Sequence, residues 1–115
     1  MIYESFEVVV VPFPFTDSRQ SKRRPALVLS SRSAFNARIG HSLLAMITSA
    51  ENSPWPLDVA ITDLAKAGLP VSSVVRMKMF TLDHRFVLGR LGCLSSKDSG
   101  RVKTAVRRLL GFVAE

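Results

Sequence analysis

A short basic segment, SKRRPALVLS at residues 21–30, carries the side chains best suited to chemistry on an anion. Lys22, Arg23 and Arg24 stand directly before Pro25, and an apolar run follows. A guanidinium offers a bidentate fork to phosphate and stays charged, and Pro25 pushes Arg24 toward an extended conformation. The segment therefore fits a site that holds an anion at the mouth of a strand. A solvated loop would use the same residues for solubility, so the local sequence leaves both interpretations open.

The charge balance favours an anionic partner. The 115 residues include sixteen Lys and Arg against nine Asp and Glu, which gives a net charge of +7 and a pI near 10.5. A domain this basic favours polyanions, with nucleic acid first, acidic protein segments second and anionic membranes third. The apolar content of 47% is typical of a globular chain, and the length fits a single domain over residues 1–115.

Cysteine and histidine positions argue against a disulfide and a zinc site. Cys93 is the sole cysteine, which fits a reducing compartment. His41 and His84 lie far apart in the sequence, no Cys/His cluster has zinc-ligand spacing, and we expect both histidines to be structural or exposed. The longest apolar stretch, Val8–Phe15, is too short to span a bilayer, and the N-terminus lacks the lysines of a signal peptide. We expect a cytoplasmic protein with no membrane partner.

Short apolar runs predict the strands that position the basic segment. Val8–Val11 is a run of four valines and predicts a strand covered on both faces, which we expect Pro12 and Pro14 to end. A polar loop is expected over 16–24. The remaining predictions are strands over 26–30, 42–48, 57–61, 73–80 and 86–91, a turn over 82–85, and one or two helical turns over 62–67 ended by Gly68.

The C-terminal segment predicts an amphipathic helix over residues 97–113, with Ser96 as its N-cap. Apolar residues recur there at the spacing of one helical stripe, and the basic residues between them fit a solvated face better than a nucleic-acid contact. Strands followed by one helix predict an α+β, mainly β fold. We expect a small, strongly bent antiparallel sheet or barrel with the helix packed on it.

Several segments, in one order, resemble the MazF/PemK-type toxins of bacterial toxin–antitoxin pairs. The stretch EVVVVPFPFTDSRQSKRRPALVLS at 7–30 is similar to the first hairpin of that family. The segments that follow in the family's order are FN at 35–36, AMITS at 45–49, SSVVR at 72–76, FTLD at 80–83 and GCLS at 92–95. The resemblance covers nearly the whole chain and implies a barrel close to the SH3 type.

The resemblance also implies a homodimeric endoribonuclease. Such toxins cut single-stranded RNA at short sequences without a metal or other cofactor, and they leave a 2′,3′-cyclic phosphate and a 5′-hydroxyl. A cognate antitoxin blocks the groove with an acidic C-terminal segment. A basic toxin suits that arrangement, because the acidic segment imitates the charge of RNA.

The resemblance assigns Arg24, Thr48 and Arg76 to catalysis. Arg24 matches the arginine before the family's proline and would hold the scissile phosphate. Thr48 matches the threonine of the family's ITS segment and would donate to a phosphate oxygen or orient the 2′-OH. Arg76 matches an arginine of the PemK branch, with a salt-bridged surface arginine as the alternative. The residues assigned to RNA binding are Phe13, Thr16, Lys22, Arg23, Ser49 and Lys78.

Two positions depart from the family pattern. The PemK branch has an acidic residue two positions after the arginine, whereas Met77 and Lys78 follow Arg76 here. Either Arg24 and Thr48 carry the chemistry, or Lys78 adds phosphate affinity, or activity is weak. The family also has glycine before the acid that precedes the first strand. This chain has Phe6 there, which bears on the local turn rather than on the fold.

Two other functions compete with cleavage. Gyrase-poisoning toxins of the CcdB type share the barrel and cut nothing, and a degenerate family member would only bind RNA or antitoxin. Arg24 together with Thr48 favours the ribonuclease, whereas the missing acid favours the degenerate member. Trp55, between two prolines, is left open between stacking on RNA and packing at a dimer or antitoxin surface.

Overall fold

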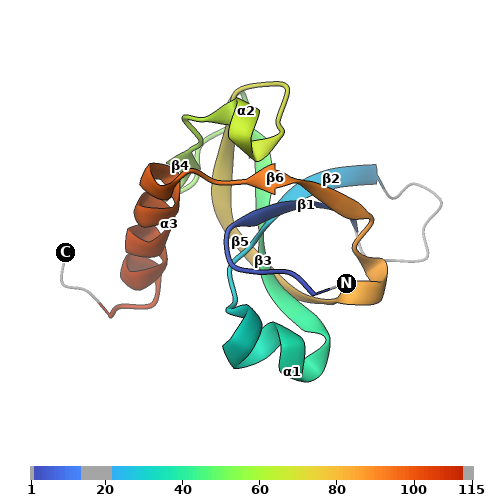
Figure 1. Ribbon diagram of the computed structural model, residues 1–115. Helices are drawn as coiled ribbons and strands as arrows, with labels where there is room; N and C mark the ends of the chain where they lie inside the picture. The colour runs from blue at the N-terminus through green and yellow to red at the C-terminus, as the bar shows by residue number, and fades with distance from the viewer. Residues whose placement is uncertain (1, 14–21, 113–115) are drawn as a thin grey trace.

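The computed structural model describes residues 2–13 and 22–112, which form one curled antiparallel sheet with short helices around it (Figure 1). The strand order is β4-β5-β3-β2-β1-β6. The mainly β fold with a strongly bent sheet and a C-terminal helix, expected from the sequence, is confirmed. The elements are β1 (Glu7–Phe13), β2 (Lys22–Val28), helical turn η1 (Arg32–Asn36), α1 (Ala37–Ile39), β3 (His41–Ser49), β4 (Val59–Ala60), α2 (Leu64–Ala67), β5 (Ser73–Asp83), 3₁₀ turn η2 (His84–Phe86), β6 (Gly89–Cys93) and α3 (Ser96–Leu109).

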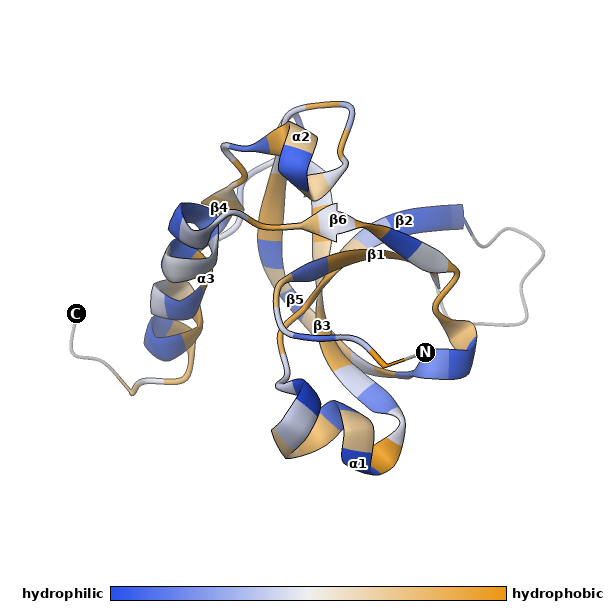
Figure 2. Cartoon of the chain, in the orientation of Figure 1, coloured by the Kyte–Doolittle hydropathy of each residue, from blue (hydrophilic) through white to orange (hydrophobic). Residues whose placement is uncertain are grey.

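The valine run of β1 is buried on both faces of the sheet, as predicted. Successive side chains of a strand point to opposite faces. Val8 therefore packs in one core cluster, which includes Val102 of α3. Val9 and Val11 pack in a second cluster on the other face. In Figure 2 most of β1 is hydrophobic, whereas β2 begins with hydrophilic residues beside the grey trace.

The prediction that Pro12 ends the pairing is wrong. Pro12 lies within β1 opposite Arg23, and β2 begins at Lys22 rather than after the predicted loop. The neighbour on the other side of β1 is β6, and its ladder with β1 stops at Val10. Beyond that point β1 is an edge of the sheet, where a residue without a backbone N–H is tolerated.

The helix α3 starts and ends earlier than the sequence predicted. Its N-cap is Ser95, whose Oγ accepts a hydrogen bond from the Asp98 amide at 3.1 Å. It ends at Leu109 because Gly111 adopts φ +74° and the Phe112 amide donates to the Arg107 carbonyl at 2.9 Å, a glycine stop that the apolar stripe does not reveal. Val113 lies outside the described residues.

A buried carboxylate joins α3 to the segment between β4 and α2, and α2 approaches β6 closely. Asp98 is fully buried, and its carboxylate accepts from the Thr62 amide at 2.9 Å and the Thr62 hydroxyl at 2.8 Å. On β6, a Cβ at Gly92 would overlap the carbonyl oxygen of Lys66 in α2. Figure 1 shows the result, with α3 beside β4 and α2 beside β6. Within the described ranges, no helix is long and apolar enough to cross a membrane.

Candidate functional site

Three strands bring the residues assigned to catalysis into one pocket of about 230 Å³. Arg24 comes from β2, Thr48 from β3 and Arg76 from β5. The pocket therefore combines an exposed guanidinium, a hydroxyl and a largely buried guanidinium. Its full lining is Phe13, Arg24, Met46, Ile47, Thr48, Trp55, Arg76 and Lys78.

The strand register explains why Arg24 and Thr48 meet. Ala26 of β2 is paired with Met46 of β3 in an antiparallel ladder. Arg24 lies two residues before Ala26, and Thr48 lies two residues after Met46. Because side chains alternate between faces with a period of two, both point to the same face at the same end of the ladder.

A bulge in β5 supplies the third side of the pocket. The ladder pairs Ile47 with Val75 and Ala45 with Met79, so β3 has one residue between these pairs and β5 has three. Arg76 and Lys78 are the outer two of those three residues, and they face the same side of the sheet. Bulges of this kind occur next to active sites, where they re-aim side chains. No pattern in the amino-acid sequence predicted this bulge.

Arg76 is held by an acid that the sequence analysis missed. Its Nε donates to Asp58 Oδ1 at 3.2 Å and its Nη2 donates to Asp58 Oδ2 at 3.0 Å, while Nη2 also donates to the Ser53 carbonyl at 2.7 Å. The side chains of Arg76 and Asp58 are 11% and 13% exposed. This is a bidentate, largely buried ion pair, so Arg76 is salt-bridged, as in the alternative weighed for it, but it lines the pocket and is buried rather than on the surface. Eighteen residues separate the partners, and no local motif links them.

The surroundings of Asp58 keep it ionised. Burial would raise the pKa of this carboxyl, but the hydrogen bonds from Arg76 and from the Trp55 amide, together with the charge of Arg76, outweigh burial and lower the pKa below its usual value. The Trp55 amide donates to Asp58 Oδ2 at 2.9 Å. One carboxylate therefore organises both the arginine and the tryptophan of the pocket.

Two further contacts orient side chains of the lining. The Asn52 side-chain amide donates to Thr48 Oγ1 at 2.6 Å, which leaves the Thr48 hydroxyl proton available to another acceptor. Lys78 Nζ lies 4.9 Å from the ring centroid of Phe13, within cation–π range. Phe13 also packs against the core, so it has a packing role as well as a place in the pocket.

The lining does not include all of the predicted RNA-binding residues. Lys22 and Arg23 are exposed on β2. By the alternation of strand side chains, Lys22 shares the face of Arg24 and Arg23 lies on the opposite face. Ser49 lies at the end of β3, and its hydroxyl accepts from the Glu51 amide at 3.3 Å, as in a strand-ending turn. Thr16 lies outside the described residues.

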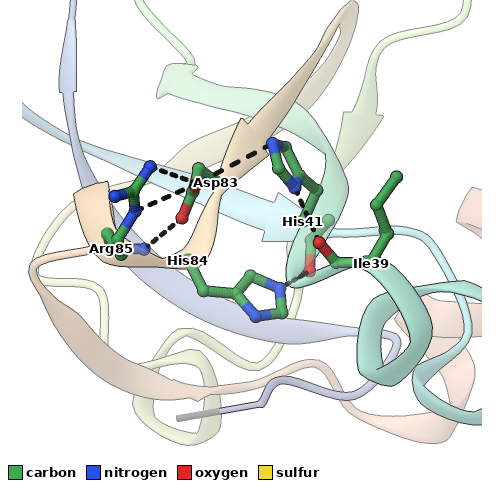
Figure 3. A network of polar contacts seen from close by, with 6 residues as sticks. Ile39, His41, Asp83, His84 and Arg85 are labelled. Carbon is green, nitrogen blue, oxygen red and sulfur yellow. Dashed lines mark hydrogen bonds and ion pairs between the residues drawn. The ribbon is translucent and has the colours of Figure 1, made fainter.

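Both histidines belong to a separate polar network (Figure 3). His84 Nε2 lies 2.7 Å from the buried Ser42 hydroxyl, and burial lowers the pKa of His84. His41 Nε2 lies 3.9 Å from Asp83, which also pairs with Arg85. Neither histidine lines the pocket, as expected of structural residues. The part of the chain that the structure describes holds no group of three or more His, Cys, Asp or Glu side chains placed to bind a metal.

A larger pocket, of about 520 Å³, lies between β4 and α3. Lys97 and Arg101 line it, as does Asp58, whose partner Arg76 lines the smaller pocket. Arg101 is already bonded to the Ala60 carbonyl at 2.8 Å and to Asp98 at 3.3 Å. We place the candidate site in the smaller pocket because it is lined by the three residues assigned to catalysis and by two aromatic rings, whereas the lining of the larger pocket includes no aromatic residue.

The turn before β1 forms although Phe6 stands where the resemblance implies a glycine. Phe6 adopts φ +69°, the left-handed region that glycine favours. Its amide donates to the Val28 carbonyl at 2.7 Å, and its carbonyl accepts from the Leu94 amide at 2.9 Å. These bonds hold a strained residue in the place of the family's glycine.

Comparison with known proteins identifies relatives of the same fold. The sequence model of one protein family, described as the PemK-like, MazF-like toxin of type II toxin–antitoxin systems, matches residues 4–110. MazF from Deinococcus radiodurans is 28% identical, with a TM-score of 0.74 over 96% of this chain and 98% of that chain. A MazE–MazF crystal structure from the same organism is 25% identical, with a TM-score of 0.76 over the same shares of the two chains.

An endoribonuclease in complex with its cognate antitoxin, from a mycobacterial species, shares the fold at 17% identity, with a TM-score of 0.74 over 99% of this chain and 98% of that chain. A comparison with curated proteins gives no match. The family model covers nearly the whole chain and agrees with the fold and with the resemblance of the sequence segments. This chain therefore belongs to the PemK-like, MazF-like toxin family of type II toxin–antitoxin systems.

Proposed function

We propose that this toxin is an endoribonuclease that cleaves single-stranded RNA, including mRNA, at short sequences without a metal. The observation that carries the proposal is the convergence of Arg24, Thr48 and Arg76 from three strands on one pocket. Membership of a family of endoribonuclease toxins supports it. The net charge of +7 supports an RNA substrate, because phosphate contacts dominate the affinity of proteins for nucleic acids.

Cleavage by this route needs no external nucleophile. The 2′-oxygen loses its proton and attacks the adjacent phosphorus, the phosphorane carries extra negative charge, and the 5′-oxygen leaves with a proton. The products are a 2′,3′-cyclic phosphate and a 5′-hydroxyl. The enzyme must therefore stabilise an anion that forms at phosphorus, which is the task for which guanidinium groups are suited.

Each polar side chain of the pocket has a role in this scheme. Arg24, exposed at the rim, holds the non-bridging oxygens of the scissile phosphate, and the Thr48 hydroxyl donates to one of them. Lys78 supplies a second mobile cation. Arg76, fixed by Asp58, supplies positive potential from the base of the pocket.

The flanking residues extend the binding surface along the RNA. Lys22 and Arg23 are exposed on the strand that carries Arg24 and would contact neighbouring phosphates. Ser49 would contribute a hydroxyl at the end of β3, and Phe13 would contribute an aromatic face. Thr16, in the β1–β2 connection, is assigned to the same surface through the family resemblance.

The direct test is cleavage of a long single-stranded RNA in EDTA by the purified protein and by an Arg24→Ala variant. We expect defined cuts with cyclic-phosphate ends, reduced roughly 10²- to 10³-fold in rate by the substitution, the range for loss of one transition-state donor. Arg38→Ala is the matched control, because Arg38 lies on α1 and bonds the Ser33 carbonyl away from the pocket.

Each other result has a definite meaning. Cuts that survive Arg24→Ala would move the chemistry toward Arg76. Cuts that vanish in EDTA and return with added metal would contradict the metal-free part of the proposal. Intact RNA in all lanes would contradict the enzyme, and gyrase supercoiling and antitoxin-binding assays would then be used to test the two alternatives.

We further propose that the toxin is a cytoplasmic homodimer neutralised by an antitoxin with an acidic C-terminal segment. Phe86, Leu88 and Leu91 are 53%, 49% and 41% exposed around β6, an apolar surface that self-association would cover. Light scattering should give twice the monomer mass. An acidic peptide that displaces labelled RNA from the pocket would support the antitoxin assignment, and a monomer in light scattering would contradict the dimer.

A further inference from the structure

The sole tryptophan of the chain stands at the rim of the candidate site. Trp55 lines the pocket with Arg24 and Lys78 and is 44% exposed. The guanidinium carbon of Arg76 lies 4.9 Å from the ring centroid, so Arg76 covers part of the ring. A large aromatic ring with this much exposed surface, beside two cations, has the composition of a surface that stacks nucleobases.

The Asp58 carboxylate fixes the position of this ring. Asp58 Oδ2 accepts from the Trp55 amide at 2.9 Å and from Arg76 Nη2 at 3.0 Å, so a single oxygen holds the backbone of the tryptophan and the cation against its ring. Pro54 and Pro56 restrict the backbone on both sides. Leu57 adopts φ +67°, a strained conformation for a non-glycine residue.

A ring held in this way is preorganised for binding. A flexible aromatic side chain loses conformational freedom when it orders against a ligand, and preorganisation reduces that loss. Local strain such as that of Leu57 persists where the surrounding contacts over-determine the backbone. The backbone contacts of this segment and the guanidinium of Arg76 therefore restrict the tryptophan before any ligand arrives.

We propose that Trp55 is the platform on which an unpaired base of the bound RNA stacks, and that Asp58 is the residue that positions it. This inference rests on the proposed function, since it takes single-stranded RNA as the ligand. The base would lie on the part of the ring that Arg76 does not cover, while Arg24 and Lys78 hold phosphates of the same strand. Stacking accepts any base, because every base has a π-face.

The chain offers a direct readout, because Trp55 is its only tryptophan. The wild-type protein is titrated with single-stranded 2′-O-methyl RNA of mixed sequence, which lacks the attacking hydroxyl. Tryptophan emission is recorded beside the fluorescence anisotropy of a labelled copy. The matched ligand is an abasic oligomer of equal length and charge. We expect saturable quenching by the RNA at the midpoint seen by anisotropy, and little change in emission when the abasic oligomer binds.

Variants separate stacking from charge. The measured quantity is the ratio of the affinity for the RNA to the affinity for the abasic oligomer. Trp55→Ala should lower this ratio roughly 5- to 150-fold, the range found when one stacking residue is replaced by alanine, whereas Trp55→Phe should keep most of it. Asp58→Asn should lower the ratio without weakening binding of the abasic oligomer, because it displaces the ring and removes no positive charge.

The outcomes distinguish this inference from the function on which it rests. RNA that binds and is cleaved with unchanged emission and an unchanged ratio in Trp55→Ala would overturn the stacking platform and leave the ribonuclease intact. A Trp55→Ala variant that keeps the ratio but dissociates in light scattering would overturn it in favour of a dimer contact. Quenching only by an acidic peptide would overturn it in favour of an antitoxin contact. Absence of both RNA binding and cleavage would overturn the proposed function as well.

Discussion

Removal of one partner of the Arg76–Asp58 pair should cost a large share of the stability of the fold. Two charge-assisted hydrogen bonds of 3.2 Å and 3.0 Å join the side chains, which are 11% and 13% exposed. Removal of one partner of a buried pair leaves an uncompensated charge and costs about 3–5 kcal/mol. Because some solvent reaches both side chains, we expect Asp58→Ala to lower the free energy of unfolding by about 3 kcal/mol, with a melting temperature lower by about 12 °C for a chain of this size.

A second ion pair in the same molecule provides the control. Arg85 donates to Asp83 Oδ2 through Nε at 3.1 Å and through Nη2 at 3.0 Å, distances close to those of the buried pair although both bonds go to one oxygen, and its side chain is 82% exposed. Arg85→Ala should have no measurable effect on stability, because exposed pairs contribute little. The comparison therefore contrasts a buried pair with an exposed pair at similar hydrogen-bond distances.

Urea unfolding followed by far-ultraviolet circular dichroism measures the effect without relying on the fluorescence of Trp55, which the substitution itself would change. The double variant Asp58→Ala/Arg76→Ala tests the cause. If the loss comes from an unpaired buried charge, removal of Arg76 as well should recover at least about 1 kcal/mol relative to the sum of the single losses. Equal losses in Asp58→Ala and Arg85→Ala, or strictly additive losses in the double variant, would refute the reasoning.

The remaining predictions concern pH and packing. The pKa values of Asp58 and Asp98 are lowered in the fold because hydrogen bonds to the carboxylates outweigh the effect of burial. The unfolded state therefore binds more protons, and the free energy of unfolding should fall as the pH drops below the ordinary aspartate value of about 3.9. Asp58→Asn should weaken this acid dependence in urea titrations, and an unchanged pH profile would contradict the assignment. Gly92→Ala should destabilise the fold by about 1–3 kcal/mol because its Cβ would overlap the Lys66 carbonyl. Gly100→Ala, in α3 with open space around it, should stabilise the fold by about 0.5–1 kcal/mol, and two effects of the same sign in thermal melts would contradict this reading.

Sequence patterns predicted those features that depend on local periodicity. The valine run identified β1 as a strand covered on both faces, because buried β-branched residues fit a pleated, half-buried surface. The stripe of apolar residues identified α3, because a helix that buries one face repeats its apolar residues at helical spacing. The errors lie at element ends. The prediction that Pro12 ends the pairing failed because it depends on where β6 stops. The prediction that the helix runs to residue 113 failed because it depends on how the backbone turns after Leu109.

The candidate site was predictable only where a motif marked it. Arg24 and Thr48 were selected through the family resemblance, and the β2–β3 register then explains why they meet. No motif indicated Asp58. Its partner Arg76 lies eighteen residues away on β5, and only the fold brings the two side chains together. The bulge that places Lys78 beside Arg76 arises because, between the pairs Ala45–Met79 and Ile47–Val75, β3 has one residue and β5 has three. A single sequence does not show this unequal count.

The pairing of β1 with β6 has a consequence for how the chain reaches its fold. Glu7 pairs with Cys93, and the Leu88 amide donates to the Val10 carbonyl at 2.8 Å, so these contacts close a loop of most of the chain. Pairings this distant in sequence require loop-closure entropy before any contact energy is gained, and they slow folding into the millisecond-to-second range. During synthesis β1 emerges early, whereas β6 is made more than seventy-five residues later. The nascent chain therefore passes through a stage in which one side of β1 is an unpaired edge, the form in which strands associate with other chains.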